Sequence, residues 1–175
     1  MLSNSLVILV RLLHIVVGAS WVGTMVFLAA YLLPTVKAVG PAAGPVFGHL
    51  TQVKKIHLHL LGMAILTVLS GITLFWHDSF GFKSDVWMHS GLGLTFSLGG
   101  TIAIVVMVIG VTVNYPAAEK LGELGAVVRA SGPPSAAQAA EMERLQNRLA
   151  VATKVAAVLL VIAVGTMAVA RYVPL

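Results

Sequence analysis

The chain has 175 residues, of which 58% are apolar and only 10% are charged, and its formal net charge is +5. A soluble domain carries about 25% charged residues, so this composition excludes an ordinary soluble protein and indicates an integral membrane protein that contacts the lipid bilayer. The absence of cysteine excludes disulfides, thiolate-ligated metal centres and cysteine nucleophiles. The basic residues flank apolar runs instead of clustering with exposed aromatics, so we expect no nucleic-acid partner.

The first apolar run predicts a transmembrane helix over about residues 6–33. It is interrupted by few polar residues and is followed by Pro34. About 20 apolar residues cross the hydrocarbon core. The run is longer than the apolar region of a signal peptide, so we expect it in the mature protein. Residues 34–53 are rich in glycine and proline and predict a turn-rich connection.

Two further spans are predicted over about residues 54–77 and 87–115. The segment between them, 78–86, is short and polar, so these two spans should be antiparallel neighbours. The many glycines of the third span suit close helix packing. We expect Pro116 to end this span, because proline cannot continue a regular helix.

A long polar segment, 117–146, separates the third span from the fourth, and we expect it to be partly helical. Ser135 and Gln138 form a capping-box pattern, which predicts a helix start. No helix breaker occurs from there to the apolar run 147–172. One long helix should therefore include both the end of the polar segment and the fourth span.

Four spans predict an all-α four-transmembrane-helix bundle, a single membrane domain over residues 1–175 with both termini on one side. The side of the termini holds the basic residues Arg11, Lys83 and Arg171. The other side holds Lys37, Lys54, Lys55, Lys120, Arg129, Arg144, Arg148 and Lys154. Basic residues concentrate in cytoplasmic loops, so we expect the loops 34–53 and 116–147 to be cytoplasmic and the termini to be on the outer side.

Two histidines near the outer side open apolar runs in the same way. His14 is followed four residues later by Gly18, and His89 by Gly93. Residues four apart share a helix face, so each glycine should leave room for a flat ligand beside an imidazole. A b-type haem held between two helices needs one nitrogen ligand from each. We therefore predict haem b, with His14 and His89 as its iron ligands.

Two arginines are expected at the same depth. Arg11 precedes His14 by one helical turn, and Arg171 ends the fourth span. Guanidinium groups pair well with carboxylates, so both are candidate partners of the haem propionates. The ordinary alternative is that each arginine is only an interfacial anchor.

The other histidines give alternative sites. His77 is expected at the outer edge and is an alternative ligand. His57 and His59 are expected at the opposite edge of a bilayer about 30 Å thick, too far away to share a ligand with His14. They are two residues apart and point to different helix faces, so a second metal site there needs a further partner.

Two stretches carry a resemblance to a known family. Residues 13–23 read Leu-His-Ile-Val-Val-Gly-Ala-Ser-Trp-Val-Gly, with Leu-Pro at 33–34, and residues 87–89 read Trp-Met-His. They resemble the first and third spans of a group of small bacterial membrane proteins. The group includes the copper-resistance D-type proteins and the small membrane-bound protoporphyrinogen oxidase, and its histidines are associated with b-type haem.

The resemblance implies haem iron bound by His14 and His89 in a bacterial inner (plasma) membrane. The oxidase has a lysine two residues after its third-span histidine, where this chain has Gly91. The resemblance therefore implies haem binding more directly than porphyrinogen oxidation.

The leading functional hypothesis is a b-type cytochrome that passes electrons between a quinol pool and a partner protein. Ligation by two histidines leaves no open iron position, which suits electron transfer. A copper-handling protein with a site formed by His14, His77, His89 and Met88 is one alternative. Others are a protoporphyrinogen or quinol oxidoreductase, and a structural subunit that docks through residues 117–148. The sequence leaves the oligomeric state open.

Overall fold

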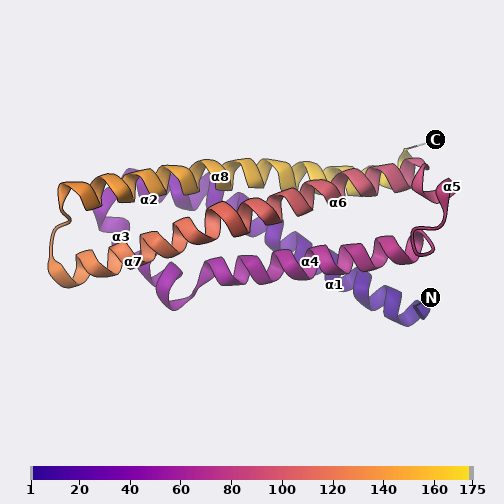
Figure 1. Cartoon of the computed structure of the whole chain (residues 1–175), viewed down its shortest axis with the longest axis horizontal. Helices are drawn as coiled ribbons and strands as arrows, with labels where there is room; N and C mark the ends of the chain where they lie inside the picture. Colours follow the sequence, from indigo (N-terminus) through magenta and orange to yellow (C-terminus); the bar gives the residue numbers. More distant parts are fainter. Residues whose placement is uncertain (1, 174–175) are drawn as a thin grey trace. The chain divides into compact units, whose positions relative to one another are not determined.

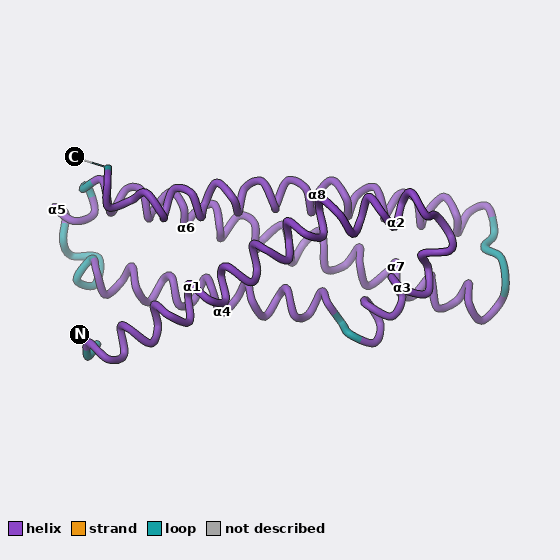
Figure 2. The backbone as a smooth tube through the Cα atoms, turned by 180° about the vertical axis from the view of Figure 1, so that it is seen from behind, coloured by secondary structure: helices purple, strands orange, loops and turns teal. Residues whose placement is uncertain are grey.

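The computed structural model describes residues 2–173, and every regular element among them is helical, which confirms the all-α class. The α-helices shown in Figure 1 are α1 (Asn4–Phe27), α2 (Leu33–Val39), α3 (Gly44–Gly48), α4 (Ile56–Asp78), α5 (Asp85–Met88), α6 (Gly91–Ile109), α7 (Tyr115–Ser131) and α8 (Ala136–Val169). Figure 2 shows that only short connections lie outside helices.

Four helical stretches of the described chain are long and apolar enough to cross a membrane. They are Asn4–Val39, Ile56–Asp78, Gly91–Ser131 and Ala136–Tyr172. Only 6% of the most apolar part of the first stretch is buried within the protein, and 11% of that of the third. Apolar surface left exposed to this extent is satisfied by lipid, so the chain is a multi-pass membrane protein.

Pro116 does not end the third span, contrary to the prediction from the sequence. A π-helical turn, Gly110–Asn114, follows α6, and Pro116 then lies in the first turn of α7. Pro34 is placed in the same way, in the first turn of α2 after the π-helical turn Leu28–Leu32. A proline needs no N–H donor in the first turn, so the change of hydrogen-bond register before it lets the helix continue.

The start of α8 confirms the predicted capping box. The backbone N–H of Gln138 donates to Ser135 Oγ at 3.3 Å, and the backbone N–H of Ser135 donates to Gln138 Oε1 at 2.9 Å. The helix then continues without interruption over 34 residues, as the sequence predicted.

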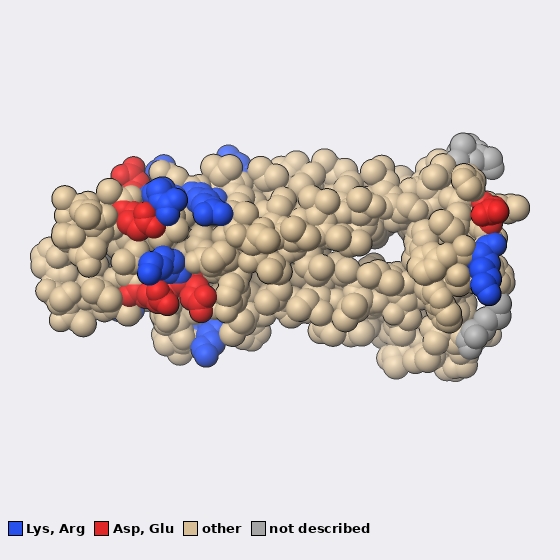
Figure 3. Space-filling view, in the orientation of Figure 1, with Lys and Arg blue, Asp and Glu red and all other residues tan. Residues whose placement is uncertain are grey.

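The chain forms two compact units. Unit 1 comprises Met1–Gly23, Gly62–Met107 and Val158–Leu175, and unit 2 comprises Thr24–Leu61 and Val108–Ala157. On the face in Figure 3, the charged side chains of unit 1 lie beside α5, and those of unit 2 gather around α7 and the first turns of α8. The rest of each unit's surface in that view is uncharged.

Unit 1 packs α6 closely against the carboxyl-terminal part of α8. A Cβ atom added to Gly99 would lie 2.9 Å from Met167 Cγ and from Thr166 Oγ1. On the other side of the unit, the Phe75 ring of α4 meets the Trp87 ring of α5 edge-on, with the ring centroids 5.0 Å apart. Glycine therefore sets the α6–α8 distance in this unit, while aromatic rings fill the space beside α5.

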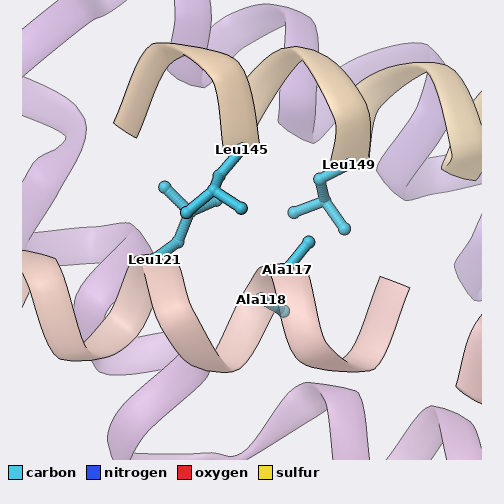
Figure 4. Packing of buried hydrophobic residues seen from close by; sticks show 5 residues of the cluster. All are labelled: Ala117, Ala118, Leu121, Leu145 and Leu149. Carbon is cyan, nitrogen blue, oxygen red and sulfur yellow. The ribbon is translucent and has the colours of Figure 1, made fainter. Parts of the chain in front are cut away.

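Unit 2 has a core of alanine and leucine between α7 and α8 (Figure 4). Its buried members are Ala117, Ala118, Leu121, Leu145 and Leu149. The small side chains of α7 admit the larger leucines of α8, so the two helices interlock. This contact joins the segment that follows the third span to the beginning of the fourth.

Candidate functional site

Unit 1 contains every residue that the sequence placed at the outer site. These residues are Arg11, His14, Gly18, His77, His89, Gly93 and Arg171. His57 and His59 belong to unit 2. The grouping expected from depth in the membrane is therefore reproduced by the compact units of the chain.

The His14 imidazole of α1 is held by the backbone of α4. Its Nδ1 atom lies 2.8 Å from the Thr67 carbonyl oxygen and 3.2 Å from Ser70 Oγ. A carbonyl oxygen only accepts hydrogen bonds, so Nδ1 carries the proton and donates it. The other ring nitrogen, Nε2, is then left with a lone pair, the state in which a histidine binds iron.

The residue that makes room at His14 is Gly71 of α4. A Cβ atom added to Gly71 would lie 2.8 Å from His14 Cε1 and 3.3 Å from Nδ1. The predicted Gly18 serves helix packing, because its added Cβ would lie 3.3 Å from Thr67 Cγ2. Thr67 Oγ1 is buried there without a hydrogen-bond partner. The sequence reasoning missed Thr67 and Gly71, whose signal was a run of small and polar residues within an apolar span.

Figure 3 shows an opening through unit 1 between α4 and α6. The helix α4 that borders it carries the backbone carbonyl and the glycine that hold His14. Space between two helices, next to an oriented imidazole, is the arrangement in which helical bundles bind flat cofactors.

His89 is not on the same helix as Gly93, contrary to the prediction. It follows α5 as the C-cap residue, and α6 begins at Gly91. The break arises because Ser90 Oγ accepts the backbone N–H of Gly93 at 3.2 Å, a cap that starts a new helix. The His89 side chain is exposed, and its Nδ1 lies 2.8 Å from the Asp85 carbonyl oxygen. By the argument used for His14, its Nε2 also has a lone pair.

Gly93 is needed for the turn between α5 and α6. A Cβ atom added there would overlap the carbonyl oxygen of Trp87 and lie 3.0 Å from that of Met88. This position therefore admits no side chain, but its role is backbone packing and not the space for a ligand that the sequence suggested.

The two predicted arginines have partners within unit 1. Arg11 Nη2 lies 3.4 Å from Asp78 Oδ2, and the other oxygen of Asp78 lies 3.1 Å from His77 Nδ1. Arg171 donates to the Tyr172 hydroxyl at 2.7 Å. Arg11 thus contacts a carboxylate as predicted, although this carboxylate belongs to the chain. Asp78 was missed because its neighbours along the sequence do not reveal Arg11 as a partner.

The histidines of unit 2 have separate surroundings. His57 meets Tyr115 edge-on with centroids 5.2 Å apart, and its Nδ1 is buried without a hydrogen-bond partner. His59 Nδ1 lies 3.3 Å from the Lys55 carbonyl oxygen. The predicted second site at these two histidines gains no additional ligand in unit 2 from this geometry.

The described residues contain no group of three or more His, Asp or Glu side chains placed to hold a metal ion. This disfavours a copper site that unites three histidines of unit 1, whereas a haem held by two histidines does not need such a group. Comparison of the chain with protein-family models, with curated proteins and with solved structures gave no match. The functional argument therefore depends on the chain's own residues.

Proposed function

We propose that the chain is a b-type haem-binding membrane cytochrome with His14 and His89 as iron ligands. One observation carries the proposal: both imidazoles hold Nδ1 against a backbone carbonyl oxygen, Thr67 for His14 and Asp85 for His89. Histidines that bind metals commonly use the second nitrogen in this way, because the hydrogen bond fixes the tautomer and the ring orientation.

The surroundings of His14 fit a flat macrocycle. The imidazole lies against Gly71, where any side chain would displace it, and unit 1 is open between α4 and α6. The bound haem would supply one-electron chemistry at its iron. The chain's contribution is to orient the imidazoles, to surround the macrocycle with apolar residues and to provide Arg11 and Arg171 at the membrane edge for the propionates.

The proposed role is electron transfer between a quinol pool and a partner protein in a bacterial inner membrane. Ligation by two histidines leaves no coordination position for a substrate, which favours electron transfer over oxygen chemistry. The distribution of basic residues supports an outer position for unit 1 and its termini, and a cytoplasmic position for the loops of unit 2.

The test is a reduced-minus-oxidised visible spectrum of the purified protein, with a pyridine haemochrome assay for stoichiometry. We expect a b-type α-band and about one haem per chain, and its loss in His14→Gly and His89→Gly. Added imidazole should restore haem binding to these variants, which separates a lost ligand from a misfolded chain.

His59→Gly is the matched control, because the Nδ1 atoms of His59 and His89 both lie near the carbonyl oxygen four residues earlier. This variant should keep its haem. A colourless wild-type protein after expression with sufficient haem, or equal haem loss in the His59 variant, would refute the assignment.

A further inference from the structure

Unit 2 contains a cavity of about 250 Å³ that the proposed cytochrome function does not use. Its wall is formed by α2 and α3 on one side and by α7 and α8 on the other. The apolar part includes Leu33, Phe47, Leu121 and Leu149. The last two residues also belong to the core in Figure 4, so the cavity has a firmly packed floor.

Two lysines from different helices border this cavity. Lys37 of α2 donates from Nζ to Asn147 Oδ1 of α8 at 3.3 Å. Lys154 lies seven residues after Asn147, about two turns or 10 Å along the same helix. Helical side chains lean toward the amino-terminal end of their helix, so Lys154 leans toward Asn147 and Lys37.

The positive charge of these lysines is not neutralised within the described chain. No aspartate or glutamate lines the cavity, and neither lysine forms an ion pair with a described residue. Other basic residues of unit 2 are paired, as in Lys120 with Glu123 at 3.5 Å and Arg144 with Glu141 at 2.7 Å. The two ammonium groups at the cavity are therefore available to an anion.

We propose that this cavity binds an anionic phospholipid, with its phosphate between Lys37 and Lys154 and the start of an acyl chain against the apolar wall. The cavity meets the surface of the protein at Val151, which is 65% exposed, so lipid has access from the side of the helices. Basic pockets between transmembrane helices bind anionic lipid headgroups in this way. A soluble anion would use the lysines but not the apolar wall.

The experiment is native mass spectrometry of the full chain in neutral detergent, titrated with phosphatidylglycerol or with phosphatidylcholine. We expect phosphatidylglycerol to bind more tightly. Lys37→Ala and Lys154→Ala should each weaken it about fivefold, and the double variant about 25-fold, as expected for one charge each near a membrane surface. Lys37→Arg and Lys154→Arg keep the charge and should keep most of the binding.

Lys120→Ala is the matched control, because it removes the same charge from unit 2 outside the cavity. Equal affinity for the two lipids, or equal loss in the control, would overturn the proposal. Displacement of phosphatidylglycerol by millimolar inorganic phosphate would also overturn it, since it would assign the lysines to a soluble anion. The experiment needs no haem, so its result is independent of the proposed cytochrome function.

Discussion

Gly71 is the residue whose substitution tests the orientation of His14 most directly. In Gly71→Ala, the new Cβ would lie 2.8 Å from His14 Cε1, whereas carbon atoms in contact are about 3.5–4.0 Å apart. The ring must therefore move by about 1 Å. Such a shift would extend the hydrogen bond from Nδ1 to the Thr67 carbonyl oxygen, now 2.8 Å long, beyond hydrogen-bonding distance. Loss of a partner that orients a ligating histidine lowers affinity about 10- to 100-fold.

The assay for this variant is the rate and extent of haem transfer from the purified protein to an excess of a haem-scavenging globin. The control is Gly62→Ala on the same helix, where an added Cβ meets no atom within 4 Å. Alanine favours a helix over glycine by about 1 kcal/mol, so the control should be as stable as the wild type or more so. If the Gly71 and Gly62 variants retain haem equally, our account of how His14 is held is wrong.

Three further predictions follow from the contacts described above. Asp78→Asn should weaken the contacts with Arg11 and His77, yet change the free energy of unfolding by only about 0–1 kcal/mol, because the pair is partly exposed; thermal unfolding in detergent would show a larger change if the contact mattered more. Leu145→Ala should destabilise unit 2 by about 2–5 kcal/mol and leave the haem spectrum unchanged; a lost spectrum with unchanged stability would contradict the assignment of this leucine to the core. Ser135→Ala removes the cap of α8 and should cost about 1 kcal/mol, seen as faster hydrogen exchange in its first turn; unchanged exchange would mean that the cap contributes nothing.

Local patterns in the sequence predicted the main helices. Each apolar run is long enough to define a span by itself, and the cap at Ser135 needs only the side chain of Gln138. The same local reasoning was wrong at Pro116, because a π-helical turn upstream shifts the hydrogen-bond register before the proline is reached. It was also wrong between His89 and Gly93, where the cap at Ser90 breaks the helix although the apolar pattern continues.

The candidate site was predictable in its residue types but not in its contacts. The sequence indicated His14 by its depth and by its place in an apolar run. It did not indicate that Thr67 and Gly71 hold this imidazole, because they are more than 50 residues away and depend on how α1 lies against α4. The ion pair of Arg11 with Asp78 is long-range in the same way. Spacing along one helix suggested Gly18 as the source of room at His14, whereas the packing of two helices determines it.

The π-helical turns before Pro34 and Pro116 make chain length a property that selection can act on at these positions. Each turn is wider than an α-helical turn, and each residue of a helix advances the direction of the side chains by about 100°. Deleting one residue from Leu28–Leu32 would leave composition and hydropathy almost unchanged, yet it would turn every later side chain of that helix, including Lys37, to a different side. Homologous chains that keep the lysine should therefore also keep the number of residues before the proline, even where the identities of those residues differ.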